Sequence, residues 1–529
     1  MQPVFDQQCL FIHRLKQRSA PNYKVKLAEL SSDASNPHIF QLAKELSDAS
    51  DNYNNQYFSQ NAKDLDKVDL KELVDATNNY LSLLGGFVGN TLLENNNNKS
   101  SDDNNDKDDS DSDSDSESVG KTNSINEIDD DIEVESSSSE QKEKEKDSKK
   151  EKKQKKVESS KSSKEKSLRY NLYYQWSTIA GSERVVDSND ALLEIGNVIF
   201  NQSVWYMGYS QFLVGKNAQD DGLNDEVRNV VYDCLLRAAG GFEYIRTKLS
   251  PLMDEDVRAT DLSDSFLRVL YLQAVGQAQE LTIGRACKKN TSTNLICKIA
   301  VDTANIYQEA QTLLTNLGSL FELRLEKLSV FLNYKHSLYQ SLSYYLNAFT
   351  QNATHKYGDA IVSGQQALFN LKNAKALLKA CVSNTITLDA VKKPTNYLYN
   401  ILDTEIPRFE RENKVIGYQT VPEEVSALPD ANRLAKPRDF VMPATNALWD
   451  DKINASFNYN KKLSMADISP LAIQNTPKLE SANDKDAKED NTKDDDEKPS
   501  SSSSSSNTTT TTPKQQPKKT NSSGGCTIN

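Results

Sequence analysis

The stretch Ala278–Gln279–Glu280–Leu281–Thr282–Ile283–Gly284–Arg285–Ala286 decides the fold class of this chain. It lies within Asp264–Lys288, a segment predicted to be one helix with Ser263 as its N-cap. A short polar turn then leads into a second predicted helix, residues 294–314, which carries two apolar stripes. The two segments predict a helical pair inside a larger helical protein.

Helical periodicity continues on both sides of this pair. Residues 191–213 are apolar around most of the helix circumference, which predicts a central, buried helix. A last helix is expected to start near Asn396, with Thr395 as its N-cap, and Pro407 is expected to kink or end it. Further helices are predicted over residues 70–84, 233–248, 321–349 and 357–380, and an extended, proline-containing strip over residues 421–470.

The fold class that follows is mainly α, with a core resembling tetratricopeptide-type helix hairpins. Tyr357–Gly358–Asp359–Ala360–Ile361, followed by Ala367–Leu368, shows the alternation of small and large residues typical of such hairpins. No strict repeat period is found, so a solenoid-like core without regular repeats is expected. The mixed, proline-containing segment near the N-terminus is consistent with a few short strands.

Two low-complexity stretches interrupt this pattern. Residues 95–167 hold 22 acidic side chains and 15 lysines, and residues 471–529 contain poly-Ser and poly-Thr runs. Such compositions bury too little apolar surface to offset the entropy of ordering, so both stretches are predicted to be disordered. The expected domain is therefore split into residues 1–94 and 168–470, and the insertion costs little because closure entropy grows only logarithmically with loop length.

Composition narrows the class of function. The formal net charge is −13, and no basic stripe with interleaved aromatic residues is evident, so a nucleic-acid partner is not expected. Six widely spaced cysteines without a CxxC pair indicate a reducing, intracellular setting. No apolar run approaches the length of a membrane span, so any membrane contact should be peripheral or lipid-mediated.

No motif indicates catalysis, a cofactor, a metal site or a small-molecule substrate. The four histidines are scattered, without a partner at metal-ligand spacing. Gly120–Lys121–Thr122 resembles part of a phosphate loop, but Asp115 stands where that motif needs glycine. A non-enzymatic protein is therefore predicted.

The C-terminal residues Cys526–Thr527–Ile528–Asn529 form a prenylation pattern, with a cysteine four residues from the end and an aliphatic residue two places later. Asn529 favours farnesyl over geranylgeranyl, because its small amide is closer to glutamine or serine than to leucine. A chance cysteine in a low-complexity tail is the alternative. Prenylated Cys526 would place the protein in the cytoplasm, peripheral on a membrane, with endosomal and nuclear-envelope membranes as candidates.

The helical pair resembles the Bro domain of the Alix family. The resemblance rests on Ala278–Gln279–Glu280 and Ala304–Asn305–Ile306–Tyr307, supported by Val204–Trp205–Tyr206 and Arg237–Ala238–Ala239–Gly240–Gly241–Phe242. It covers nearly all of residues 1–94 and 168–470, and the terminal CaaX box points to one branch of the family. The resemblance implies a boomerang-shaped helical domain.

The resemblance also implies a function. Bro domains bind the C-terminal amphipathic helix of an ESCRT-III subunit in an apolar patch, which maps onto Thr282, Leu295, Ile299 and Leu434 of this chain. Ordinary core packing explains the same spacing equally well. Two further alternatives are a prenylated helical scaffold that binds some other partner, with no ESCRT role, and a lipid-anchored enzyme of unrecognised type.

Overall fold

The computed structural model describes residues 10–33, 35–58, 68–89, 168–179, 185–217, 223–258, 261–383, 386–459 and 461, with only the main chain for 319–324. The predicted insertion, the predicted tail and Cys526 lie outside the described residues. The chain divides into two units, Met1–Ile473 and Gln474–Asn529, and the description below concerns the first.

The described part is mainly helical, which confirms the predicted fold class. Where the structure describes the chain, no helix is both long and apolar enough to cross a lipid bilayer. The helices are α1 (Tyr23–Leu30), α2 (Pro37–Phe58), α3 (Leu70–Val88), η3 (Leu168–Tyr170), α6 (Ala191–Asn217), α7 (Asp225–Tyr244), η4 (Ile245–Leu249), η5 (Ser250–Leu252), α8 (Glu255–Arg258), α9 (Asp264–Lys288), α10 (Thr293–Asn316), α11 (Ser319–Ala353), α12 (Tyr357–Cys381), α13 (Leu388–Glu412), η6 (Asn413–Gly417) and α14 (Asp451–Ala455).

Three short strands form one antiparallel sheet in the order β1 (Arg18–Ser19), β2 (Tyr174–Ser177) and β3 (Val185–Ser188). Arg18 lies opposite Trp176 in the register. Only β1 belongs to the N-terminal segment where strands were expected, whereas β2 and β3 follow the predicted insertion. β2 and β3 were not predicted from the sequence.

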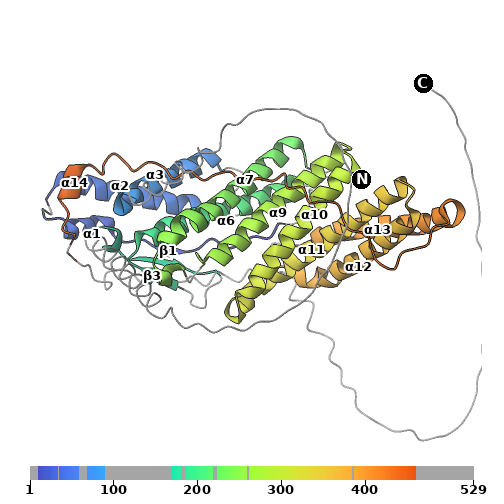
Figure 1. Ribbon diagram of the computed structural model, residues 1–529. Coiled ribbons are helices and arrows are strands. Elements are labelled where there is room, and N and C mark those ends of the chain that lie inside the picture. Colours follow the sequence, from blue (N-terminus) through green and yellow to red (C-terminus); the bar gives the residue numbers. More distant parts are fainter. Residues whose placement is uncertain are drawn as a thin grey trace, which may run out of the picture. The chain divides into compact units, whose positions relative to one another are not determined.

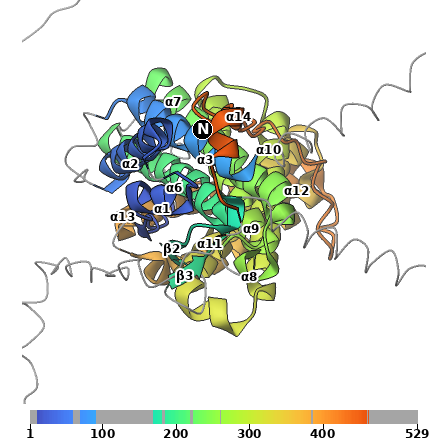
Figure 2. The ribbon, with the colours of Figure 1, turned by 90° about the vertical axis from the view of Figure 1, so that its left-hand side faces the viewer.

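Helix α6 is the centre of the N-terminal half, as its apolar circumference predicted. Every side chain from Ala191 to Met207 is buried, and the helix lies in the middle of its neighbours when viewed end-on (Figure 2). Asp190 begins the helix, because its carboxylate accepts a hydrogen bond of 2.9 Å from the N–H of Leu192.

Helices α9 to α13 follow one another as packed hairpins (Figure 1). The turn between α9 and α10 is tight, with Asn290 in the left-handed region at φ 51°. The N–H of Thr291 donates to the carbonyl of Ala286 at 3.0 Å, and the Ser292 hydroxyl accepts from the N–H of Leu295 at 3.4 Å. These bonds end one helix and begin the next, and so fix α9 against α10.

The start of α13 was predicted wrongly. The helix begins at Leu388 with Thr387 as its N-cap, whereas Thr395 lies inside it and donates its hydroxyl to the carbonyl of Val391 at 2.9 Å. Pro407 does not end the helix, since α13 continues to Glu412. The helix continues because its buried apolar stripe extends past this proline, and the packing offsets the lost hydrogen bond. Ser263 does precede α9, but its side chain forms no capping bond.

A buried ion pair joins β1 to the helices around it. Arg18 pairs with Glu194 of α6, and both side chains are almost completely buried. Glu194 also accepts hydrogen bonds from the Trp176 indole at 2.6 Å and from the Tyr80 hydroxyl at 2.8 Å. Arg18 donates to the Ser50 hydroxyl at 2.6 Å. One pair of charges therefore connects β1, β2, α2, α3 and α6.

Candidate functional site

An extended segment, residues 418–450, follows η6 and crosses the surface of the helices towards α14 (Figure 1); we call it the closing strip. It is attached through its backbone. The N–H of Asn432 donates to the carbonyl of Lys298 on α10 at 3.0 Å, and the N–H of Arg438 donates to that of Leu236 on α7 at 3.0 Å. The N–H of Asn446 donates to the carbonyl of Ser82 on α3 at 3.0 Å. The strip therefore ties the two halves of the helical unit together.

Gln279 holds the strip at its crossing with α9. Its amide nitrogen donates to the carbonyl of Asn432 at 3.0 Å and to the carboxylate of Asp302 at 2.9 Å. Its amide oxygen accepts from the N–H of Ala435 at 2.9 Å and of Leu434 at 3.3 Å. This one buried side chain satisfies three backbone groups of the strip, so it fixes the position of Leu434.

The next residue of the same stretch, Glu280, points into the core instead. Its carboxylate pairs with the ammonium of Lys335 on α11 at 2.8 Å and accepts from the Tyr307 hydroxyl on α10. Burial raises the pKa of Glu280, while the Lys335 charge opposes that shift. Gln279 and Glu280 thus have separate tasks, the first at the strip and the second between the helices.

The structure brings Thr282 and Leu434 together through Tyr232 of α7. The Tyr232 hydroxyl donates to the carbonyl of Leu434 at 3.5 Å and forms a hydrogen bond with the Thr282 side chain. Burial raises the pKa of Tyr232, and the Thr282 bond together with the charges of Arg285 and Arg438 opposes the shift. Leu434 is 42% exposed and Thr282 is half-buried, so both present surface to solvent at this point.

Leu295 and Ile299 lie one turn apart on α10, beside Lys298, whose carbonyl holds the strip. Leu295 is partly buried and packs against the core, whereas Ile299 is only 1% exposed. Ile299 therefore fits the core-packing alternative and supports the surface from beneath. Thr282, Leu295 and Leu434 form the accessible part of the predicted patch, which we call the crossing site.

Cations surround the crossing site. Arg285 follows Thr282 by one turn, Lys298 follows Leu295 by one turn, and Lys436 is two residues beyond Leu434. Arg433 also lies beside it and forms an ion pair of 3.1 Å with Asp302. The site therefore combines apolar surface with a positively charged border.

Two adjacent glycines of α7 allow close packing against two different neighbours of the helix. A Cβ at Gly240 would lie 1.6 Å from the carbonyl oxygen of Arg438 in the strip. A Cβ at Gly241 would lie 2.1 Å from the Ser203 hydroxyl on α6. Gly240 therefore admits the strip and Gly241 admits the central helix.

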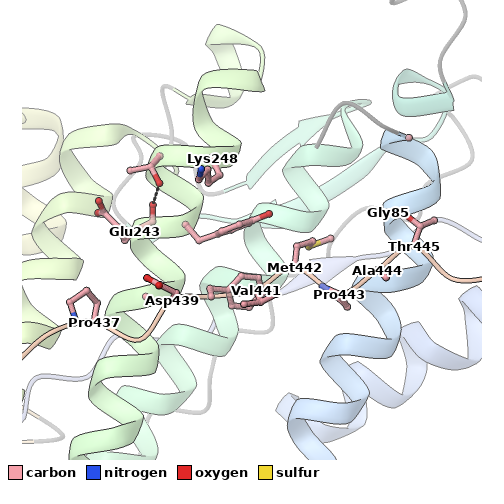
Figure 3. A pocket seen from close by; sticks show the side chains of 15 residues that line it. Gly85, Glu243, Lys248, Pro437, Asp439, Val441, Met442, Pro443, Ala444 and Thr445 are labelled. Carbon is pink, nitrogen blue, oxygen red and sulfur yellow. Dashed lines mark hydrogen bonds between the residues drawn. The ribbon is translucent and has the colours of Figure 1, made fainter. Parts of the chain in front are cut away.

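A cavity of about 450 Å³ lies where the strip runs between its attachments at Leu236 and Ser82 (Figure 3). Its lining includes the strip residues 439–445 and residues of α7 and α3. The charged groups that line it are Glu243, Lys248 and Asp439, and Glu243 is already paired with Arg246 at 2.8 Å. Within the described residues, no three His, Cys, Asp or Glu side chains are placed to hold a metal ion.

A family model described as "BRO1-like domain" matches residues 151–479. The chain belongs to this family. BRO1 domain-containing protein BROX of Homo sapiens is 28% identical over 310 residues, which cover 57% of this chain and 74% of that protein. The BROX homolog of Caenorhabditis elegans is 24% identical over 318 residues, covering 58% and 72%. The expected resemblance to the Alix-like BRO1 family is confirmed.

Solved BRO1 structures share the fold. The ALIX BRO1 domain in complex with CHMP4C aligns with a TM-score of 0.52 at 14% identity, covering 83% of this chain and 97% of that one. ALIX in complex with the SIVmac239 PYKEVTEDL late domain aligns with a TM-score of 0.54 at 14% identity, covering 84% of this chain and 51% of that one. The Alix-like helical architecture predicted from the sequence is therefore confirmed.

Tyr232 and the strip attachments of this BRO1 domain were missed from the sequence. Tyr232 lies on another helix, α7, so no spacing within the chain links it to Thr282 or Leu434. The sequence did contain a signal for Gln279, because it is a polar residue in a part of α9 that is otherwise expected to be buried. A polar side chain in a buried helix needs partners, and here the strip provides them.

Cys526, the predicted lipidation site, lies outside the described residues. Cys234, Cys287, Cys297 and Cys381 are buried, and none of them forms a disulfide within the described residues. Burial raises the pKa of Cys234 and of Cys297 to about 12, so their reactive thiolate forms are scarce at neutral pH. These four thiols of the BRO1 domain are therefore poor sites for a surface modification.

Replacing Gln279 with leucine should release the strip at the crossing site. We expect faster amide hydrogen exchange at Leu434 and Ala435, because both N–H groups lose their acceptor. Gln277→Leu is the matched control, since Gln277 is buried on the same helix and its amide has no hydrogen-bond partner within the described residues. Unchanged exchange in Gln279→Leu would contradict the role of Gln279.

Proposed function

We propose that this BRO1-domain protein is a non-enzymatic adaptor that binds the C-terminal helix of an ESCRT-III subunit at the crossing site. The observation that supports this most is the position of Leu434. The side chain is 42% exposed, although Gln279 fixes its backbone beside Thr282 and Tyr232. A fixed and exposed aliphatic side chain suits the recognition of an apolar helix face better than it suits core packing.

The border of the crossing site defines the chemistry of the partner. Arg285, Lys298 and Lys436 surround the apolar surface, so a helix with carboxylates beside its apolar stripe fits best. Leu295 provides a second apolar contact on α10. The complex of the ALIX BRO1 domain with CHMP4C supports a partner of this class.

The membrane half of the proposal rests on Cys526. A prenyl group there, preferentially farnesyl, would hold the adaptor peripherally on the cytoplasmic side of an endosomal or nuclear-envelope membrane. One lipid chain alone gives weak, reversible attachment. Simultaneous binding of a membrane-bound filament subunit would make the attachment durable, because each contact raises the local concentration for the other.

Leu434→Asp tests the partner-binding role. We expect roughly 30-fold weaker binding of a synthetic ESCRT-III C-terminal helix, because a charge replaces an apolar anchor of the interface. Val441→Asp is the matched control, since Val441 is 80% exposed on the same strip but lies outside the crossing site. Fluorescence anisotropy with the labelled peptide measures both variants.

Equal affinity of Leu434→Asp and wild type would contradict this proposal. If the wild-type protein does not bind the peptide at all, the alternative of a prenylated scaffold for another partner gains support. Both variants change exposed side chains, so melting temperatures close to wild type should accompany the binding data.

Cys526→Ser tests the lipid anchor. We expect intact mass of the wild-type protein from eukaryotic cells to show a prenyl-sized gain and loss of the last three residues, and the variant to show neither. Membrane fractionation should then show at least about a tenfold loss of membrane-bound protein in the variant. An unmodified C-terminus in the wild type would remove the membrane half of the proposal.

A further inference from the structure

Helix α12 carries three lysines on one exposed side. Lys372, Lys375 and Lys379 follow each other at steps of three and four residues, which places them in one stripe about 10 Å long. Asp359, in the first turn, is the one acidic residue of this helix. The stripe was not predicted from the sequence, where acidic residues dominate and the net charge is −13.

The neighbourhood of these lysines adds positive charge. Lys327 of α11 reaches the end of the stripe, where its ammonium donates to the carbonyl of Ala380 at 2.9 Å. Lys375 lies over the ring of Tyr399 on α13, at 4.9 Å from its centre. None of the three stripe lysines forms an ion pair with a residue that the structure describes, and this includes the acidic residues of α13.

An exposed aromatic residue lies at one end of the stripe. Phe369, one turn before Lys372, is 58% exposed. The small residues Ala376 and Ala380 are also exposed between and beside the lysines. The surface therefore presents long, flexible cations around short side chains, with one large apolar group beside them. We call Phe369, Lys372, Lys375 and Lys379 the lysine face.

We propose that the lysine face contacts an anionic lipid surface. Lysine is a flexible point charge that extends towards lipid head groups and requires no fixed geometry from them. Phe369 can enter the head-group region while the ammonium groups remain at its border. An acidic protein segment fits this face less well, because specific recognition of carboxylates usually employs the rigid fork of arginine, and the face has none.

This contact goes beyond the prenyl anchor and does not depend on it. A single lipid chain needs a second attachment to the membrane. Each lysine close to an anionic surface strengthens binding, so three of them form a substantial second attachment. The lysine face should therefore act in a chain that carries no lipid.

The test uses the full-length chain made in bacteria, which do not prenylate it. Sedimentation with phosphatidylcholine vesicles, with and without phosphatidylserine, measures the partition coefficient of wild type and of Lys372→Glu/Lys375→Glu/Lys379→Glu. We expect wild type to bind only the phosphatidylserine vesicles, and more weakly at high salt. The triple variant should bind them roughly 100-fold more weakly.

Lys24→Glu/Lys44→Glu/Lys71→Glu is the matched control, because it makes the same change in net charge at exposed lysines of α1, α2 and α3. It should bind much more tightly than the triple variant of the lysine face. Phe369→Ala should reduce binding a few-fold without changing its dependence on salt.

Three results would overturn the proposal: no binding of wild type to phosphatidylserine vesicles, equal binding to both kinds of vesicle, or equal binding of the two triple variants. A poly-glutamate peptide serves as the acidic protein probe. If the lysine-face variant loses this peptide but still binds vesicles like wild type, the face belongs to a protein partner. None of these outcomes affects the crossing site, which is tested separately with the helical peptide.

Discussion

Replacing Glu194 with alanine is expected to lower the free energy of unfolding by about 3–5 kcal/mol. The substitution leaves the Arg18 guanidinium buried without its counter-charge. It also removes the acceptor of the Trp176 indole and of the Tyr80 hydroxyl. Buried donors without acceptors are costly because they have lost water and gained nothing in return.

Urea denaturation followed by circular dichroism measures this change. Glu309→Ala is the matched control, since Glu309 pairs with Arg268 at 2.9 Å on the surface, where both side chains are partly exposed. The control should lose no more than about 0.5 kcal/mol. If both variants lower the free energy of unfolding equally, the buried network around Arg18 and Glu194 contributes no more to stability than a surface ion pair.

Gly240→Ala is expected to cost about 3 kcal/mol and to detach part of the closing strip. The added Cβ would lie 1.6 Å from the carbonyl oxygen of Arg438, so either the strip or α7 must move. The strip should move first, because it is extended and lacks the internal hydrogen bonds that hold α7 together. Denaturation gives the stability, and protease cleavage within the strip reports its release.

Gly215→Ala controls for the effect of alanine in a helix. No atom lies within 4 Å of a Cβ at Gly215, so helix propensity decides the outcome. This variant should be unchanged or more stable by up to about 1 kcal/mol. A Gly240→Ala protein with wild-type stability and an intact strip would show that the strip does not pack closely against α7.

Helix α9 could be predicted from the sequence to the residue, whereas the start of α13 could not. Apolar periodicity and the polar turn after Lys288 mark this segment in the sequence, although the Ser263 side chain forms no capping bond in the structure. In α13, Thr395 was expected to be the N-cap, but the helix already begins at Leu388 because the preceding turns are packed against the core. Val391 is fully buried there, and local helix propensity does not predict such burial, because burial depends on the tertiary contacts of the helix.

The crossing site, too, could be predicted only in part from the sequence. Leu295 and Ile299 share one stripe of α10, so spacing cannot tell which of them is accessible; in the structure Ile299 is buried. The family resemblance predicted Leu434 as a partner-binding residue, but it did not predict the contacts of its backbone with Tyr232 and Gln279. These residues are far apart in the chain and come together only when the strip folds back across α10, α9 and α7.

The position of the closing strip has a consequence for biosynthesis. The residues that complete the crossing site are made long after the helices on which they lie, since Leu434 follows Thr282 in the chain by well over a hundred residues. While the ribosome is still producing α11 to α13, the helical surface exists without the strip. The crossing site is therefore completed only after α11 to α13 have been made and the strip has left the ribosome, so competence to capture a partner arises later than the helical surface itself.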